Sequence, residues 1–212
     1  MSDSPSDARD LANLSNADSE QEFNQMVGSL LERHRSRIKR LVLLRLSERV
    51  RSRVDASDIV QEVMVEAARR FPKYVRERPV ALALWLRQIT MDRIRMSHRM
   101  HVDALRRSVE REQPFLEPNL QAISKSFSKH LADQARSPSS EAMFDELYRR
   151  VELLMKDLSE TDRELLLLRH FEQLDNQQAA IILNMNPSTC SSRYLRTLKR
   201  LRTELAKVPG YQ

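Results

Sequence analysis

Apolar residues recur at steps of three and four along most of the chain, and this spacing places side chains on one face of an α-helix. The first such stretch covers about residues 22–50, the second about 55–72, and the third about 80–111. Further stretches with the same period lie between about residues 143 and 207. The pattern therefore predicts helices throughout, and it gives no run of alternating residues that would indicate a sheet.

Composition strengthens this prediction, because the 212 residues include only two glycines. Tight hairpins and phosphate-binding loops depend on glycine, since both need a positive φ or a close approach of the backbone. We therefore predict an all-α fold, and we exclude Rossmann and P-loop folds.

Polar segments divide the chain into two small helical domains joined by a flexible linker. Residues 1–21 contain too few apolar side chains to form a core, so we expect a disordered acidic tail. Residues 22–111 form the first predicted domain and residues 143–207 the second. Between them, residues 112–142 are rich in serine and contain three prolines, which predicts a linker with at most short helical pieces.

Charge is distributed unevenly between these segments. Residues 1–24 contain six acids and only Arg9 as a base, whereas residues 25–112 contain 21 lysines and arginines against 11 acids. A strongly basic domain indicates a polyanionic partner, because solubility, the simpler explanation, rarely needs such one-sided charge. The sequence has no apolar run of membrane-spanning length and no signal peptide at its start, so we expect a cytoplasmic protein that contacts no membrane.

No constellation of catalytic or metal-binding residues stands out, so we predict neither an enzyme nor a cofactor. Cys190 is the only cysteine, which excludes an intramolecular disulfide and a cysteine-based zinc site. It falls on the apolar face of a predicted helix, so we expect a packed thiol.

The end of the chain has the layout of a helix-turn-helix. Asp175 and Gln178 form a predicted capping box for a short helix at 176–183, Asn184 is a plausible left-handed stop, and Asn186-Pro187 opens a longer basic helix. Hydroxyls and cations of this helix suit base edges and phosphates of DNA. The predicted DNA-binding residues are Ser188, Thr189, Ser191, Ser192, Arg193, Arg196, Lys199 and Arg200. An ordinary amphipathic helix with a solvated basic face is the alternative, but the preceding helix and turn favour DNA.

The second predicted helix carries polar side chains beside its apolar stripe. These are Asp55, Asp58, Gln61 and Glu62. A metal site is one interpretation, but no other cluster of acids or histidines completes a ligand shell, and we predict no bound metal. A solvated acidic face is the second interpretation. Acids within a basic domain favour the third, a docking surface for a basic partner.

The third predicted helix and its continuation carry many arginines, including Arg87, Arg93, Arg95, Arg99, Arg106, Arg107 and Arg111. His98 and His101 have the spacing of metal ligands, yet the surrounding cations would repel a metal ion, so contact with nucleic acid is the better interpretation. The spacing of Trp85 with Leu82 and Ile89 predicts core packing rather than stacking on a base.

Three segments resemble one family. Residues 55–62 read Asp-Ala-Ser-Asp-Ile-Val-Gln-Glu and resemble the Asp-Ala-Glu-Asp-Leu-Val-Gln-Glu segment of region 2.2 in extracytoplasmic-function (ECF) sigma factors of bacterial RNA polymerase. Residues 85–90 resemble the Trp-Leu-x-x-Ile-Ala start of region 2.3, and residues 174–201 resemble region 4. The resemblance covers about residues 25–110 and 143–206, with a variable linker between them.

This resemblance implies a subunit that binds core RNA polymerase and recognises promoter DNA. Region 2.2 would dock on the β′ coiled coil through the four polar residues at 55–62, and region 4 would contact the β flap and read the −35 element. The opened −10 element would contact Arg87, Asp92, Arg93, Arg95, His98 and Arg99. An anti-sigma factor is a further candidate partner.

The chain departs from the family pattern at three positions: Asp92 replaces a common Asn, Ser57 replaces a Glu, and Asn184 replaces the turn glycine. A stand-alone helix-turn-helix regulator, with residues 25–110 as a dimerisation or sensing domain, is the alternative function, and an RNA-binding protein that uses the arginine-rich tract is a weaker third.

Overall fold

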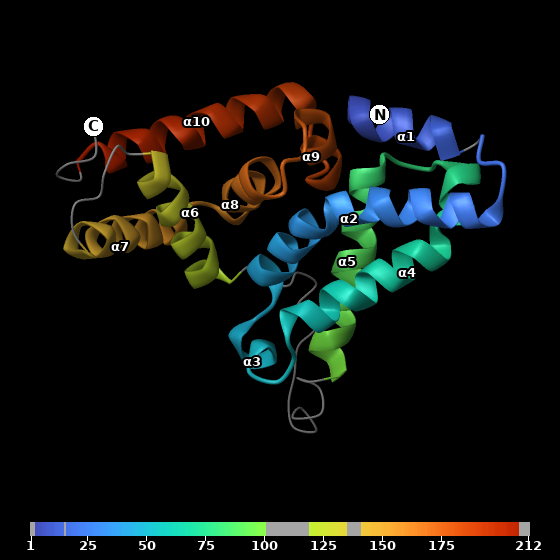
Figure 1. Cartoon of the computed structure of the whole chain (residues 1–212). Helices are drawn as coiled ribbons and strands as arrows, with labels where there is room; N and C mark the ends of the chain where they lie inside the picture. Colours follow the sequence, from blue (N-terminus) through green and yellow to red (C-terminus); the bar gives the residue numbers. More distant parts are fainter. Residues whose placement is uncertain (1–2, 15, 101–118, 135–140, 208–212) are drawn as a thin grey trace. The chain divides into compact units, whose positions relative to one another are not determined.

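The computed structural model describes residues 3–14, 16–100, 119–134 and 141–207, and all regular structure within them is helical (Figure 1). The chain divides into two compact units, Met1–Glu117 and Pro118–Gln212. The elements of the first unit are α1 (Pro5–Leu14), α2 (Glu20–Arg45), α3 (Glu48–Arg51), α4 (Ala56–Glu77) and α5 (Leu82–His98). The elements of the second are α6 (Leu120–Gln134), α7 (Glu141–Asp157), α8 (Glu160–Leu166), the π-helical turn η2 (Leu167–Phe171), α9 (Asn176–Ile182) and α10 (Pro187–Leu205). The predicted fold class, two small all-α domains, is confirmed.

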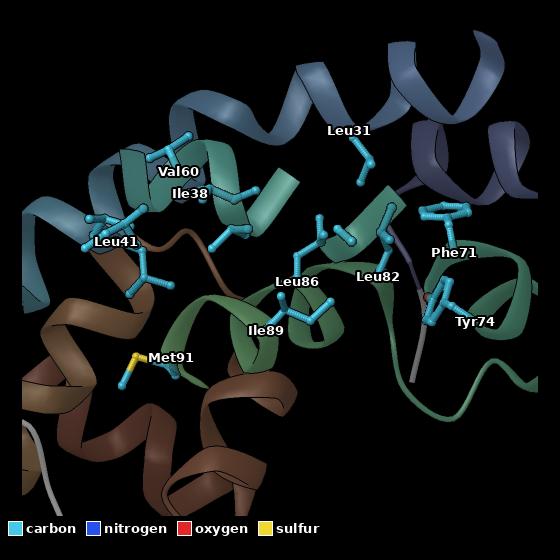
Figure 2. Close-up of a cluster of buried hydrophobic side chains, with 14 of the residues drawn as sticks. Leu31, Ile38, Leu41, Val60, Phe71, Tyr74, Leu82, Leu86, Ile89 and Met91 are labelled. Carbon is cyan, nitrogen blue, oxygen red and sulfur yellow. The ribbon is translucent and has the colours of Figure 1, made fainter. Parts of the chain in front are cut away.

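The core of the first unit lies between α2, α4 and α5, which pack against one another (Figure 2). Each helix contributes its apolar stripe, and the buried side chains include Leu31, Ile38, Leu41, Val60, Val63, Leu82, Leu86 and Ile89. At one end of this core, Trp85 stacks on Tyr74 at 4.5 Å between ring centroids and meets the edge of Phe71 at 5.6 Å. The predicted core role of Trp85 is thus confirmed.

Two helix boundaries in this unit differ from the sequence prediction. The helix expected over 22–50 ends at Arg45 and is followed by the short α3. The helix expected to stop at Phe71-Pro72 continues through Pro72 to Glu77. Phe71 and Tyr74 are both buried and lie three residues apart, so the helix beyond Pro72 keeps an aromatic face on the core. The predicted helix over 80–111 is seen as α5, while residues 101–111, with His101, Arg106, Arg107 and Arg111, lie outside the described residues.

The structure has a helix where the sequence predicts disorder in residues 1–21. Helix α1 packs on α2, with Leu11 and Leu14 buried. Asp7 accepts a hydrogen bond from the His34 ring at 3.0 Å, and the Arg78 guanidinium donates to the Leu11 carbonyl at 2.7 Å. The segment has few apolar residues, but two of them fall on one side of a short helix, and polar contacts with the folded domain supplement their burial.

The second unit contains a further helix in the segment expected to be a linker. Helix α6 packs on α7, and its Ile123, Phe127 and Leu131 are buried. Phe127 lies 5.9 Å from Phe171 between ring centroids, so α6 also reaches the end of η2. The serines of this segment do not prevent a helix because apolar residues recur every four positions among them. Residues 112–118 and 135–140 of the expected linker lie outside the described residues.

Candidate functional site

The polar residues predicted to dock a partner lie along one exposed face of α4. Asp55 is the N-cap of this helix, and its carboxylate accepts a hydrogen bond from the Ser57 backbone N–H at 2.7 Å. This hydrogen bond lowers the pKa of Asp55 below its ordinary value. Asp58, Gln61 and Glu62 follow at steps of three and four, and all are exposed. The four side chains therefore form one surface, which we call the α4 face.

Val65 extends the α4 face by one more turn and was missed by the sequence interpretation. It is 60% exposed and lies three and four residues after Glu62 and Gln61. An apolar side chain beside carboxylates resembles the centre of a protein interface, where apolar contact supplies affinity and surrounding polar groups supply orientation. The sequence does contain a signal for this residue, because the spacing of Val65 from Gln61 and Glu62 places it on the polar side of the helix rather than on the apolar stripe.

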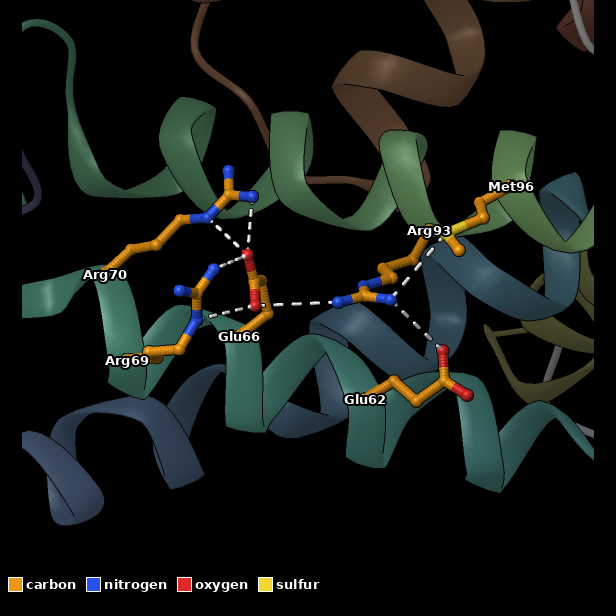
Figure 3. A network of polar contacts seen from close by, with 6 residues as sticks. All are labelled: Glu62, Glu66, Arg69, Arg70, Arg93 and Met96. Atoms are coloured by element: carbon orange, nitrogen blue, oxygen red, sulfur yellow. Dashed lines mark hydrogen bonds and ion pairs between the residues drawn. The ribbon is translucent and has the colours of Figure 1, made fainter.

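An arginine of α5 joins the α4 face to the predicted DNA-binding helix (Figure 3). The Arg93 guanidinium lies 3.7 Å from the carboxylate of Glu62 and 3.5 Å from that of Glu66. Glu66 is largely buried and also pairs with Arg69 at 2.7 Å and with Arg70 at 2.5 Å. The hydrogen bond from Arg69 lowers the pKa of Glu66, and Arg70 lowers it too. Burial acts in the opposite direction, but the pKa still falls to about 2. One residue of each predicted set, Glu62 and Arg93, thus faces the other.

The remaining predicted residues of α5 differ in how accessible they are. Asp92 and Arg95 form an exposed ion pair at 3.0 Å, and Arg99 is exposed. Arg87 is partly buried. His98 is also partly buried, and its Nε2 accepts a hydrogen bond from the Ser47 backbone N–H at 3.4 Å. Burial lowers the pKa of His98, which favours the neutral ring that can accept this bond.

In the second unit, α9 and α10 form a helix-turn-helix in which hydrogen bonds cap the start of each helix and the end of α9. The Asp175 carboxylate accepts from the Gln178 N–H at 2.8 Å, and the Gln178 side chain accepts from the Asp175 N–H at 3.1 Å, which confirms the capping box. Asn184 adopts a left-handed φ of 49°, and the next N–H, that of Met185, donates to the Ala180 carbonyl at 2.9 Å. Asn186 caps α10, as predicted.

A side-chain contact fixes the two helices of this motif to each other. The Asn176 side-chain amide, in the first turn of α9, donates to the carbonyl of Pro187 at 2.7 Å. The start of α10 is therefore held by the start of α9 as well as by the turn between them.

The final helix has one buried and one exposed side. Cys190, Thr197, Leu201 and Leu205 are buried, and burial raises the pKa of the Cys190 thiol, so the expected packed cysteine is confirmed. Seven of the eight predicted DNA-binding residues are exposed, and Arg193 is partly buried; the exposed ones are Ser188, Thr189, Ser191, Ser192, Arg196, Lys199 and Arg200.

Two of the four predicted cations, Arg193 and Arg200, are paired with acids of the same unit. Arg193 donates to the Asp162 carboxylate at 2.9 Å and to the Ser159 hydroxyl at 3.4 Å. Arg200 forms an ion pair with Asp157. Burial raises the pKa of Asp162, but the hydrogen bonds from Arg193 and Ser159 outweigh it and the pKa is lowered overall.

Comparison with known families adds an independent finding. Residues 30–102 match the family model for sigma-70 region 2, and residues 148–201 match the model for sigma-70, region 4. Together the two matches cover more than half of the 212 residues and contain the α4 face, α5 and most of the helix-turn-helix. No curated protein matches the chain.

Metal-binding sites and membrane-spanning helices are two further features that the described residues lack. Within the described ranges, no three His, Cys, Asp or Glu side chains come together as metal ligands would. The helices described here all fall short of the combined length and apolarity that a membrane crossing requires.

Proposed function

The chain belongs to the sigma-70 family as a sigma factor of the ECF type, and from this premise we propose which of its surfaces perform each step of promoter recognition. It binds core RNA polymerase and directs initiation at specific promoters, and sigma-factor families are not enzymes. The alternative of a stand-alone helix-turn-helix regulator is not favoured, because the first unit matches region 2 rather than being an unrelated sensing or dimerisation domain.

The α4 face is the proposed docking surface for the polymerase, with the basic coiled coil of the β′ subunit as its partner. The observation that carries this proposal is an exposed row of acidic and amide side chains, Asp55, Asp58, Gln61 and Glu62, within a basic domain. Among the described residues, no cation lies within ion-pair distance of the Asp58 carboxylate, so its charge is available to a partner. Val65 adds an apolar contact in the same line.

The exposed cations of α5 are the proposed contacts to the opened −10 element. Arg95 and Arg99 are the most accessible of them and suit phosphate contacts. Arg93 has a further proposed role, because its contacts with Glu62 and Glu66 connect the docking face to the DNA-binding helix. Polymerase docking and −10 binding would then share one polar network.

The exposed side of α10 is the proposed contact to the −35 element. Its hydroxyls at 188–192 lie in the first turns, where a recognition helix meets base edges, and Arg196 and Lys199 follow where phosphates would lie. We further propose the β flap as the partner of this unit, the cytoplasm as its compartment because the polymerase works there, and an anti-sigma factor as a candidate regulator.

Reversing charge on the α4 face tests the docking proposal. The double variant Asp58→Lys/Glu62→Lys should lower the affinity for core polymerase at least tenfold, because two attractive charge contacts become repulsive. Fluorescence anisotropy of labelled protein titrated with core enzyme gives the affinity, and circular dichroism checks that helicity is kept.

Glu20→Lys/Glu77→Lys is the matched control, because it makes the same change in net charge and also reverses one acid in the first turn of a helix. It should bind core polymerase as the wild type does. Wild-type affinity in the test variant would overturn the docking proposal. An equal loss in the control would also overturn it, because the loss in the test variant would then be an effect of overall charge.

A further inference from the structure

Leu195 is a large apolar side chain in the middle of the polar, exposed side of α10. It is 62% exposed, more than the other exposed large hydrophobic residues of the described chain. It continues the line of Ser188 and Ser192 and precedes Lys199, at helical steps of four, three and four. The buried line of the same helix, from Cys190 to Leu205, lies on the opposite side. Leu195 therefore has no role in the core of its own domain.

The position of Leu195 limits what it could contact. If α10 enters a major groove, this line of residues faces the base edges. The floor of that groove presents hydrogen-bond donors and acceptors at every base pair, and its one apolar group is the C5-methyl of thymine. A leucine cannot hydrogen-bond to the other groups, and it would leave them without a partner.

We propose that Leu195 is a specificity-determining residue that packs against a thymine methyl group in the upstream promoter element. This inference rests on the proposed role of α10 and deepens it. The neighbouring Ser192 would bind a polar base atom beside the methyl group, and Lys199 would bind a phosphate beyond it, and these two contacts would fix the register of the helix. The predicted element contains a thymine at the position facing the third turn of α10.

Replacing thymine by uracil tests the contact directly, because uracil lacks only the methyl group. The experiment uses the holoenzyme formed from the full chain and core polymerase, on a promoter found by run-off transcription and footprinting. Each thymine of the upstream footprint is changed to uracil in turn, on either strand. Wild-type holoenzyme should lose about fourfold in affinity at one thymine, the worth of one buried methyl group, and little at the others.

Substitution of the leucine should remove this sensitivity. Leu195→Ala should bind the thymine and uracil templates equally, at about the level of wild type on uracil. Leu153→Ala is the matched control, since Leu153 is 58% exposed and belongs to α7 rather than to the recognition helix. This control should keep the fourfold ratio. Because both leucines are exposed, neither change should unfold the domain, and circular dichroism checks this.

Several results would overturn the proposal. They are wild-type binding that is indifferent to every uracil, an unchanged thymine-to-uracil ratio in Leu195→Ala, or a footprint beneath α10 that contains no thymine. Failure of the proposed role of α10 looks different, because the holoenzyme would then protect no upstream element in the footprint.

Discussion

His98 lies in a basic stretch, yet its ring turns toward the backbone of Ser47. Only a neutral ring can accept the Ser47 N–H, since a protonated imidazole has two donors and no acceptor. Burial lowers the pKa of His98, so the folded protein binds this proton less tightly than the unfolded chain does. The contribution to stability is therefore complete above a pH of about 6.5 and is lost as the pH falls below that value.

The prediction at this residue is that His98→Gln makes the first unit less sensitive to acid. Glutamine can still accept the Ser47 N–H through its carbonyl but cannot be protonated. Between pH 7.5 and pH 5.5 the wild type should lose on the order of 1 kcal/mol more stability than the variant, the worth of one hydrogen bond. Urea unfolding followed by tryptophan fluorescence measures this, because the single tryptophan, Trp85, lies in the core of the same unit. Equal losses in both proteins would show that His98 stays unprotonated or contributes nothing.

At the scale of elements, α1 is a helix that depends on its neighbours. Ten residues are too few for a stable isolated helix in water, so its helicity must come from packing on α2. Leu11 is fully buried in that contact, and Asp7 is held by His34. Burial raises the pKa of Asp7, whereas the hydrogen bond and charge of His34 lower it. The lowering effects are the larger together, so the pKa of Asp7 lies below its ordinary value.

We predict that Leu11→Ala releases α1 while leaving the rest of the unit folded. Truncation of a buried leucine costs about 2 to 5 kcal/mol, which is comparable to what one short helix can gain by docking. Limited trypsin cleavage after Arg9 should become at least tenfold faster, whereas the urea midpoint reported by Trp85 should change little. The control Ala12→Ser alters an exposed position of the same helix and should leave cleavage slow. Unchanged cleavage in Leu11→Ala would mean that other contacts hold α1.

The elements differ in how well the sequence predicts them, and the reason is the distance over which each is determined. Caps are local, so Asp175 with Gln178 and Asn186 with Pro187 were correctly predicted from residues within four positions of each other. Helices α1 and α6 were missed because their short apolar stripes are stabilised by partners elsewhere in the chain. A low apolar content therefore predicts that a segment cannot fold alone, which is a weaker statement than disorder.

In the candidate site, too, the sequence predicts local features but not contacts between distant residues. The pattern of α4 predicted which residues share a face, and the structure places them so. The pairing of Arg93 with Glu66 joins residues 27 positions apart on two helices, and no spacing rule reveals it. The same holds for Arg193 with Asp162 and for Arg200 with Asp157, where the sequence predicted free cations for DNA. Residue type indicated the chemistry, but only the packing of helices shows which charges are already paired.

For the whole molecule, these internal pairs bear on how strongly the free protein attracts DNA. The chain has 36 lysines and arginines against 30 acids, and a net charge of +6 would favour non-specific binding to any duplex. Acids that hold Arg193 and Arg200 reduce the number of cations ready to contact phosphate. We therefore expect the full-length protein without polymerase to bind duplex weakly, with specific affinity arising only in the holoenzyme.

Removing one of these acids should make the free protein bind duplex more tightly. Asp162→Asn keeps the shape of the side chain and one acceptor oxygen, but it removes the negative charge that pairs with Arg193 and so makes the charge of Arg193 available to phosphate. Affinity at low salt should rise several-fold, and the slope of log affinity against log salt should become steeper by up to about 0.9, the value for one phosphate contact. Asp145→Asn changes the same net charge at an exposed position of α7 and should leave the slope as it is. Gel-shift titrations over a range of salt concentrations decide between these outcomes.

If both variants changed the slope alike, general charge rather than the Arg193 pair would govern DNA attraction. If the wild type without polymerase already bound duplex tightly and specifically, the expectation that specific affinity arises only in the holoenzyme would be wrong.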